Sequence, residues 1–401
     1  MTPYVYIAGE SSVRIWGLTP SQRVARVLSA AGACRTLRAF GDLQDGDTVL
    51  ILRGDYLFDD RLINYLAETP GIVLQLGGNR EKVAVAAHGP ARLAKQALTV
   101  ISENTAGLAL DEIRPQTLEA LSISYQQRTR KFEAPFVLPV SAGKKRDLER
   151  RLFDWSYKGV TDLITKWMWP VPARWAVGQC VRWGIRPNQV TLLSLLLVIM
   201  AGLLFARGQY GWGLLAGWLM TFLDTVDGKL ARVTVTSSPF GHYFDHLIDL
   251  VHPPIWYILW GYGLLGSYPG GPGFSMTFIC WGILVGYVAG RLAEGLFKWC
   301  LGRFGMFCWR PLDSYFRLIT ARRNPNLILL TIGFVTGRPD LGLLAVVFWT
   351  ISTSLFLGLR LVWAAYVRIR QGPLRSWLMD VNPLSDGDGL ALRWFTRHAK
   401  N

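Results

Sequence analysis

One short stretch, residues 224–249, limits what the rest of this chain can fold into. It reads DTVDGKLARVTVTSSPFGHYFDHLID and lies between strongly apolar segments. Ionisable groups at membrane depth are costly, so Asp224, Asp227, Asp245 and Asp249 are candidates for a function. Residues three or four apart share one face of a helix, so the aspartates form two pairs. Two such helices side by side would make a cage of oxygen ligands that suits a hard cation such as Mg²⁺.

The composition is that of a membrane protein joined to a more polar part. Of 401 residues, 51% are hydrophobic, including 17 Trp, as expected for an integral membrane protein. Residues 1–150 carry mixed charge and no apolar run near 18 residues, whereas apolar runs begin near Val190. We therefore expect at least two domains, with the soluble domain first.

The net charge of +15 could indicate a nucleic-acid-binding protein. The sequence has no zinc-finger spacing or RNA-binding signature, and its basic residues flank apolar runs, as in membrane proteins with cytoplasmic Lys and Arg. We predict no nucleic-acid partner. The five cysteines form no C-x-x-C pair and indicate neither a disulfide framework nor a zinc site. Residues 1–10 lack a signal-peptide pattern, so we expect the first domain in the cytoplasm.

Residues 1–140 alternate short strand-like runs with helical patterns, which predicts an α/β domain with a predominantly parallel sheet. The expected strands are Tyr4–Ala8, Thr48–Arg53, Gly71–Leu76 and Val83–Ala87, and the expected helices are Ser21–Ala31, Asp60–Glu68 and Ala91–Ile101. Ligands of such domains bind beyond the carboxyl ends of the strands. Gly9–Arg14 and Arg53–Asp55 fall there.

The segments YIAGESSVRIWGLTP and LILRGDYLFDD resemble the opening loop and the metal-aspartate strand of sugar- and alcohol-phosphate nucleotidyltransferases. The resemblance implies that Asp55 would help to hold Mg²⁺ near a nucleotide. However, the glycine-rich loop is reduced to Gly9 followed by Glu10, which would repel a triphosphate, and the usual Pro-Lys pair is missing after Pro20. We predict that this domain is degenerate and has lost transferase activity. It would then be a structural, regulatory or dimerising domain.

Residues 141–188 form a basic connector with helical periodicity, in which Leu148, Leu152 and Trp155 share one side. Four tryptophans follow among Arg and Pro: Trp167, Trp169, Trp175 and Trp183. A basic, amphipathic, Trp-rich segment is typical of a helix on the cytoplasmic membrane surface. The alternative, a solvated linker, explains the charge but not the tryptophans.

Residues 189–370 contain six apolar segments that we expect to cross the membrane, several of them with polar extensions that help to span about 30 Å. They are Gln189–Ala206, Trp212–Thr225, Tyr243–Leu265, Met276–Trp299, Asn324–Thr336 and Leu341–Val367. The Lys298–Arg323 connection has six basic residues against Asp313 alone. By the positive-inside tendency it lies in the cytoplasm, together with both termini, the tail 371–401 and the aspartates. In a bacterium this would be the inner membrane.

The aspartates belong to a longer pattern, D-x-x-D-G-x-x-A-R-x8-G-x3-D-x3-D, with eight fixed positions in 26 residues. These are Asp224, Asp227, Gly228, Ala231, Arg232, Gly241, Asp245 and Asp249. The pattern resembles the signature of CDP-alcohol phosphotransferases, and Arg186–Thr191 looks like the start of that family's first membrane helix. The resemblance covers about residues 145–370, including the count of six helices.

In that family, the first three aspartates bind the metal ions, Mg²⁺ or Mn²⁺, and cytidine diphosphate. The resemblance implies that Asp249 is the base that deprotonates the acceptor hydroxyl. The two metals would neutralise the pyrophosphate and stabilise the leaving CMP. Gly228 and Ala231 leave room for a nucleotide, and Gly241 allows close helix approach, as small residues do in membrane bundles. Arg232 can meet phosphate charge with two hydrogen bonds.

Further residues are weaker candidates for substrate contacts. Asn188 lies just before the first span, on the donor side, and Lys158 could reach an acceptor phosphate, although an interfacial lysine is commoner. Arg322 and Arg323 open the fifth span at the cytoplasmic face, where they could bind lipid headgroups or acceptor phosphate. Arg291 lies three residues before Glu294. It either pairs with that carboxylate or contacts an acceptor phosphate.

The aspartates could instead form intramembrane salt bridges with Arg232 and Lys229. Two cations cannot neutralise four carboxylates in a low dielectric, so we disfavour this explanation. The nearby His242, His246 and His252 could bind metal, but hard cations prefer oxygen, which favours packing or a hydrogen bond for them.

Together these features predict a two-domain integral membrane transferase, with a cytoplasmic α/β domain before an all-α bundle of six transmembrane helices. The reaction would move a substituted phosphate from a CDP-linked donor to an acceptor alcohol and release CMP. The fused first domain is similar to that of enzymes pairing CTP:inositol-1-phosphate cytidylyltransferase with di-inositol-phosphate-phosphate synthase, which implies an inositol-type substrate. The alternatives are a phospholipid synthase using CDP-diacylglycerol with glycerol phosphate or inositol phosphate, and a non-catalytic scaffold or ion-binding transporter. We expect membrane lipid as a partner and, from the resemblance, a homodimer.

Overall fold

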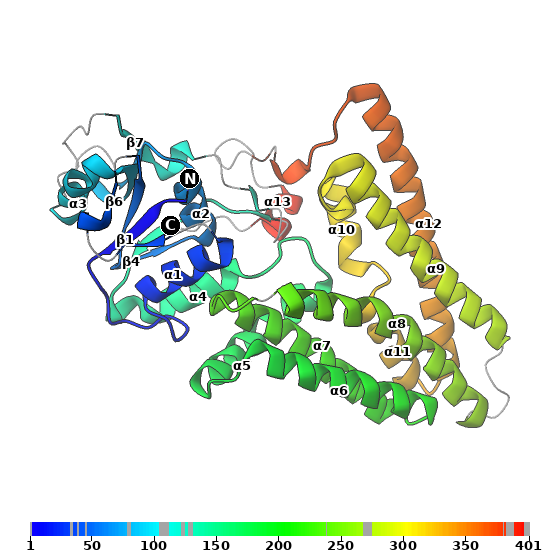
Figure 1. Cartoon of the computed structure of the whole chain (residues 1–401). Coiled ribbons are helices and arrows are strands. Elements are labelled where there is room, and N and C mark those ends of the chain that lie inside the picture. Colours follow the sequence, from blue (N-terminus) through cyan, green and yellow to red (C-terminus); the bar gives the residue numbers. More distant parts are fainter. Residues whose placement is uncertain are drawn as a thin grey trace.

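Figure 1 shows a computed structural model of the chain, in which an N-terminal part built around a sheet lies beside a group of long helices. The structure describes residues 2–32, 35–37, 40–44, 46–77, 82–103, 112–121, 125–126, 131–237, 239–267, 275–379, 381 and 389–396.

The N-terminal part is organised around a six-stranded sheet with the order β2-β1-β3-β6-β5-β7. Its strands are β1 Tyr4–Ala8, β2 Arg35–Thr36, β3 Thr48–Arg53, β5 Ile72–Leu76, β6 Val83–Pro90 and β7 Arg114–Thr117. The sheet is mixed, because β6 runs antiparallel to β3 and β5 while the other neighbours pair in parallel. Only six residues separate Leu76 from Val83, which is too short for the crossover that a parallel pair needs. The prediction of a predominantly parallel sheet therefore needs one correction, at β6.

Helices cover both faces of this sheet. They are α1 Pro20–Ala31, α2 Asp60–Glu68 and α3 Ala94–Ser102. Consecutive residues of β3 point to opposite faces of the sheet and pack in different hydrophobic cores. Leu50 packs with α1 and α2, whereas Ile51 packs with α3. A strand buried on both faces has a continuous apolar run, and TVLILR is such a run. Two short pairs complete this part: β4 Tyr56–Phe58 with β10 Val137–Pro139, and β8 Tyr125–Gln126 with β9 Lys131–Phe132.

The remainder of the described chain is helical. The helices are α4 Lys145–Trp155, α5 Pro170–Arg182, α6 Pro187–Ala206, α7 Tyr210–Val233, α8 Pro239–Ser267, α9 Met276–Leu296, α10 Pro311–Ile319, α11 Arg323–Val335, α12 Pro339–Gln371 and α13 Leu390–Phe395. Each of the six predicted spans coincides with a helix, namely α6, α7, α8, α9, α11 or α12. Figure 1 shows α9 and α12 as a long pair beside the other helices.

Three helical segments in the described part of the chain are long and apolar enough to cross a membrane: Pro187–Ala206, Met276–Gly302 and Pro339–Gln371. The chain is thus an integral membrane protein, whereas a bundle of six spanning helices remains a prediction. α11 has 13 residues, which at 1.5 Å per residue give about 20 Å and fall short of a bilayer core. α7 is longer, with 24 residues, but its last three turns carry the charges of the aspartate motif.

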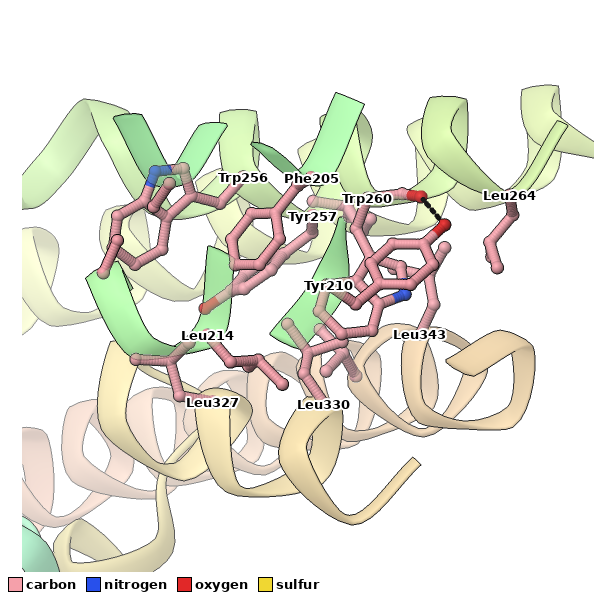
Figure 2. Close-up of a cluster of buried hydrophobic side chains, with 14 of the residues drawn as sticks. Phe205, Tyr210, Leu214, Trp256, Tyr257, Trp260, Leu264, Leu327, Leu330 and Leu343 are labelled. Carbon is pink, nitrogen blue, oxygen red and sulfur yellow. Dashed lines mark hydrogen bonds between the residues drawn. The ribbon is translucent and has the colours of Figure 1, made fainter. Parts of the chain in front are cut away.

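An aromatic core holds the long helices together. Figure 2 shows Trp256, Tyr257 and Trp260 of α8 among side chains from α6, α7, α11 and α12. Buried Tyr and Trp need polar partners, and backbone oxygens supply them for Tyr210, Trp256 and Trp260. Tyr210 Oη donates to Trp260 O (3.2 Å), and Trp256 Nε1 donates to Val198 O (2.9 Å). These bonds fix α7 and α8, the two helices that carry the aspartates, against the rest of the bundle.

The connector packs on protein along its first helix, which corrects the expectation that all of it lies on the membrane. Leu148, Leu152 and Trp155 do share one side of α4, but this side is buried against the loop after β1 and against α7. The loop after β1 covers the apolar side of α4 that was expected to face the membrane. Its Trp16 packs in the same core as α4 and α7 and donates from Nε1 to Glu149 O (2.8 Å). Trp175 of α5 is 68% exposed, and its contact with the membrane surface stays a prediction.

The expected tail after α12 partly folds back onto the bundle. Ser376 Oγ donates to Cys308 O (2.7 Å), Trp377 Nε1 donates to Ser314 Oγ (3.0 Å), and the ring of Phe395 in α13 is 1% exposed. Residues 376–379 and 390–396 are therefore part of the folded protein.

Candidate active site

One aspartate of each predicted pair contacts the same residue of a third helix. Asp224 lies on α7, Asp249 lies on α8, and Arg323 is the first residue of α11. One nitrogen of the Arg323 guanidinium, Nη2, is 2.5 Å from Asp224 Oδ2, and the other, Nη1, is 2.5 Å from Asp249 Oδ1. The two carboxylates therefore face each other across a single positive charge.

Asp227 lies one turn further along α7 and is 5% exposed. It accepts a hydrogen bond from Thr191 Oγ1 of α6 (2.7 Å), and Asn188 lies one turn before Thr191 on the same face of α6. The next residue, Gly228, leaves open space beside α7. Among the described residues, a Cβ atom there would meet the Arg232 guanidinium alone, at 3.6 Å. Space for a nucleotide at Gly228 was expected from the resemblance and stays a prediction.

The two cations of the motif itself, Lys229 and Arg232, both contact the end of α4. Lys229 Nζ (3.2 Å) and Arg232 Nη1 (2.7 Å) both donate to the carbonyl oxygen of Ser156, at the C-terminal end of α4. Cations are favoured at the end of a helix where carbonyl groups lack partners. Lys229 also lies 3.4 Å from the centre of the Tyr157 ring. The structure gives Arg323 as a partner that Asp224 and Asp249 share, and this partner was not among the cations that the sequence offered.

The side chains of Asp245 and His242 lie outside the described residues, although their backbone is part of α8. His252, further along α8, hydrogen-bonds through Nδ1 to Ile248 O (2.7 Å) and its ring packs edge-on against Trp256. The predicted packing role is confirmed for this histidine.

The donor chemistry at the aspartates fits a hard divalent cation. Carboxylate oxygens from two helices converge on one positive group, and Asp224, Asp227 and Asp249 against Arg323 leave a formal charge of −2. Oxygen donors with this charge suit Mg²⁺ or Mn²⁺. In the described part of the chain, no three His, Cys, Asp or Glu side chains already lie close enough together to hold a metal ion. The Arg323 guanidinium takes up the space between the two carboxylates.

A second cluster of charges lies next to the first. Glu294 of α9 pairs with Arg291 (Nη2 to Oε1, 2.5 Å) and also with Arg322. The pairing that the sequence offered as one alternative for Arg291 is therefore confirmed. Neighbouring residues Arg322 and Arg323 point to different carboxylates, and Lys158 together with Arg322 attracts Asp249 electrostatically. Three of the cations proposed from the sequence, Arg323, Arg322 and Lys158, thus act on Asp249, and the fourth, Arg291, shares Glu294 with Arg322.

Asp162 is a buried carboxylate that sequence reasoning missed. It accepts hydrogen bonds from Thr165 Oγ1 (2.9 Å) and Asn324 Nδ2 (2.9 Å), which ties the first turn of α11 to the connector. Burial acts to raise its pKa, but the charge of Arg317 and the hydrogen bonds hold the pKa of Asp162 below its ordinary value. The only signal in the sequence was an acidic residue in a largely apolar segment, which does not reveal its distant partner.

The two loops expected to bind a nucleotide in the N-terminal part are packed against each other. Gly54 N donates to Ala8 O (2.8 Å), and a Cβ atom at Gly54 would lie 2.2 Å from Gly9 O. Asp55 pairs with Arg53 of the same loop (Nη2 to Oδ2, 2.6 Å). Asp55 is thus neutralised within its own loop, and the loss of transferase activity in this domain stays a prediction.

In a comparison with known protein families, residues 185–295 match the family model described as CDP-alcohol phosphatidyltransferase. The match includes Asp224 to Asp249 and Arg291, and it confirms the resemblance carried by the motif. It does not include Arg323 or the N-terminal part.

Relatives of known name are similar over parts of the chain. They include phosphatidylinositol phosphate synthase of Streptomyces avermitilis, which is 39% identical over 72 residues, or 18% of this chain and 30% of the relative. Bifunctional IPC transferase and DIPP synthase of Rubrobacter xylanophilus is 29% identical over 161 residues, or 40% of this chain and 34% of the relative. Cholinephosphotransferase 1 of Xenopus laevis is 26% identical over 182 residues, or 42% and 38%. This chain thus spans between 30% and 38% of the lengths of these three relatives.

Proposed function

We propose that this protein, whose residues 185–295 form a domain of the CDP-alcohol phosphatidyltransferase family, is a membrane-bound transferase. It moves a substituted phosphate from a CDP-linked donor to an acceptor hydroxyl and releases CMP. One observation carries the proposal: Asp224 and Asp249, from two helices of the matched domain, converge on one positive charge, with Asp227 one turn away. Such clustered carboxylates are costly inside a membrane protein unless they serve a function.

The carboxylates have separate tasks in this proposal. Asp224, Asp227 and Asp245 hold divalent cations and the donor, with Asp249 at the other side of the cluster. When bound, Mg²⁺ or Mn²⁺ would neutralise the pyrophosphate and the leaving CMP. Asp249 accepts the proton of the acceptor hydroxyl as that oxygen attacks phosphorus. Its side chain is 38% exposed, whereas that of Asp224 is 16% exposed, so Asp249 is the more accessible base.

The donor nucleotide lies along α7 in this proposal. Gly228 and Ala231 provide a flat surface on one face of the helix, and Asn188 lies across from them on α6 near Thr191. Arg232, anchored at Ser156 O through Nη1, has Nη2 near Gly228 and can meet a phosphate oxygen there. Gly241 lies in the first turn of α8.

The acceptor approaches the cationic end of the cluster. Arg291, Arg322, Arg323 and Lys158 gather near Asp249 and Glu294, an excess of positive charge that suits an acceptor carrying a phosphate. The relatives named for phosphatidylinositol phosphate synthesis and for IPC transfer and DIPP synthesis support an inositol-type alcohol. The second candidate is a phospholipid synthase that joins CDP-diacylglycerol with glycerol phosphate or inositol phosphate.

The remaining features complete the proposal. Six membrane helices form the transferase half, with the active site and both termini on the cytoplasmic side, and the protein acts as a homodimer in contact with membrane lipid. The closed loops around Gly54 support an N-terminal domain without transferase activity.

Release of CMP by the purified protein in lipid nanodiscs tests the proposal. Each CDP donor (CDP-diacylglycerol and CDP-inositol) is combined with inositol phosphate or glycerol phosphate, with Mg²⁺ or Mn²⁺ present. We expect CMP with one donor type only, which separates the two candidates. Absence of CMP with every combination would contradict the enzymatic proposal and favour a scaffold or ion-binding transporter.

A further inference from the structure

Arg323 occupies the position between two carboxylates that a metal ion would need. Its guanidinium contacts Asp224 Oδ2 and Asp249 Oδ1 at the same time, and its side chain is 13% exposed. Each of the two contacts is a hydrogen bond between ionised groups, which is stronger than one between neutral groups. Two carboxylates of different helices therefore share one internal counter-cation.

We propose that the Arg323 guanidinium occupies the metal site until a divalent cation displaces it. The displaced guanidinium is then available to bind the anionic acceptor. This inference rests on the proposed function, because it assigns a regulation of binding to the same site. It makes metal binding and acceptor binding coupled events that share one side chain.

Competition follows from the atoms involved. A divalent ion must contact carboxylate oxygens directly, at about 2.0–2.1 Å for Mg²⁺. Asp224 Oδ2 and Asp249 Oδ1 are in contact with Arg323 instead. Two positive groups cannot both lie between these oxygens at such distances, because their repulsion is strong where water is scarce. Metal binding on this side therefore requires the guanidinium to leave.

The surroundings of Arg323 allow its side chain to move while its backbone stays in place. Nε of Arg323 is buried and has no hydrogen-bond partner among the described residues, so rotation of the guanidinium breaks no bond at that atom. The backbone is fixed by the next residue, since Asn324 Nδ2 donates to Asp162 Oδ1 (2.9 Å). The first turn of α11 thus acts as a fixed base for a movable charge.

The carboxylate next to this site, Glu294, already has cationic partners and cannot fully neutralise a displaced Arg323. Glu294 pairs with Arg291 and with Arg322. A released guanidinium therefore adds uncompensated positive charge to a partly buried region, which is unfavourable until an anion binds there. Metal binding should then increase the affinity for an anionic acceptor, and by linkage the anion should increase the affinity for metal by the same factor.

Binding of Mn²⁺ to the purified full-length protein, measured by electron paramagnetic resonance without any donor, tests this inference. Removal of the competitor by Arg323→Gln should lower the Kd for Mn²⁺ about 10-fold, within the usual range of coupling between sites. The matched control is Arg322→Gln, which removes the adjacent charge but not a contact to Asp224 or Asp249. It should lower the Kd by less than Arg323→Gln does, because Arg322 pairs with Glu294.

A second measurement examines the coupling. Inorganic phosphate should lower the Kd for Mn²⁺ of the unaltered protein and should have no such effect on Arg323→Gln. Should that variant fail to fold, Arg323→Lys serves instead, because an ammonium group makes weaker contact with two separated carboxylates, and its Kd should still fall.

An unchanged or higher Kd in the Arg323 variant, an equal decrease in Arg322→Gln, or no Mn²⁺ binding at all would each overturn the inference. Failure of this inference can be told apart from failure of the proposed function, because the assay measures bound Mn²⁺ and not released CMP. Release of CMP together with an unchanged Kd would overturn the competition alone.

Discussion

The two halves of the molecule each place carboxylates where a phosphate-handling site was expected, and they neutralise them in different ways. In the N-terminal half, Asp55 pairs with Arg53, two residues away in the same loop, and the loop is pressed against Gly9. In the helical half, Asp224 and Asp249 share Arg323, which comes from another helix 74 residues beyond Asp249. A pair within one loop persists whatever the rest of the chain does. A charge supplied by a separate helix can be withdrawn, and so the helical half retains a site that can open.

If the helical half holds the working site, loss of one of its carboxylates should give a large decrease in the rate of CMP release. We expect Asp227→Asn to reduce CMP release at least about 100-fold, because metal-assisted stabilisation of phosphate charge is worth several kcal/mol and each 1.4 kcal/mol is tenfold in rate. The control is Thr191→Val, which removes the hydroxyl that contacts Asp227 Oδ2 and Pro187 O but no carboxylate, and should cost much less. Equal rates for Asp227→Asn and the unaltered protein would contradict a role for this residue.

Much of the helical half could be predicted from the sequence because its signals are local. Six apolar segments coincide with helices, and the spacing of Asp224, Asp227 and Asp249 places them on two of those helices. The strands Tyr4–Ala8 and Thr48–Arg53 were predicted with their bounds, because alternating or continuous apolar runs decide them within a few residues.

The contacts that complete the site could not be predicted, because they join distant parts of the chain. Nothing near Asp224 indicates that Arg323 pairs with it, and nothing near Asp162 indicates Asn324. The amphipathic pattern of α4 correctly predicted a buried side but not what buries it, since membrane and protein are equally apolar partners. The direction of β6 depended on loop length, which strand patterns do not report.

A smaller effect is expected at the base of α11. Asp162→Asn removes a buried charge that faces Arg317, so it should lower the free energy of unfolding by about 1–3 kcal/mol. The pKa of Asp162 is lowered in the folded protein. Its contribution to stability is therefore present above the ordinary carboxyl pKa and is lost as the pH falls through the lower, folded value.

Thermal unfolding between pH 7 and pH 2 measures this contribution. The difference in Tm between Asp162→Asn and the unaltered protein should be largest near neutral pH and should shrink in acid. A difference that is independent of pH would mean that packing, and not charge, accounts for the role of Asp162.

The smallest effect concerns the contact between the halves. Arg26 Nη1 of α1 donates to Thr234 O (2.8 Å), just beyond the end of α7, and Arg23 Nη1 donates to Val233 O (2.7 Å). Arg26→Ala removes a cation from a helix C-terminus and should lower the free energy of unfolding by about 0.3–1 kcal/mol. Arg92→Ala, at an exposed pair with Glu112, is the matched control. Equal Tm values for the two variants would show that the N-terminal half does not support α7 through this contact.

The most direct test of the central claim compares one carboxylate from each half in the same assay of CMP release. We expect Asp55→Asn to retain the rate of the unaltered protein. Asp249→Asn should lose about 100- to 10,000-fold, the usual contribution of a general base. Full activity in Asp249→Asn, or a comparable loss in Asp55→Asn, would contradict the assignment of the chemistry to the helical half.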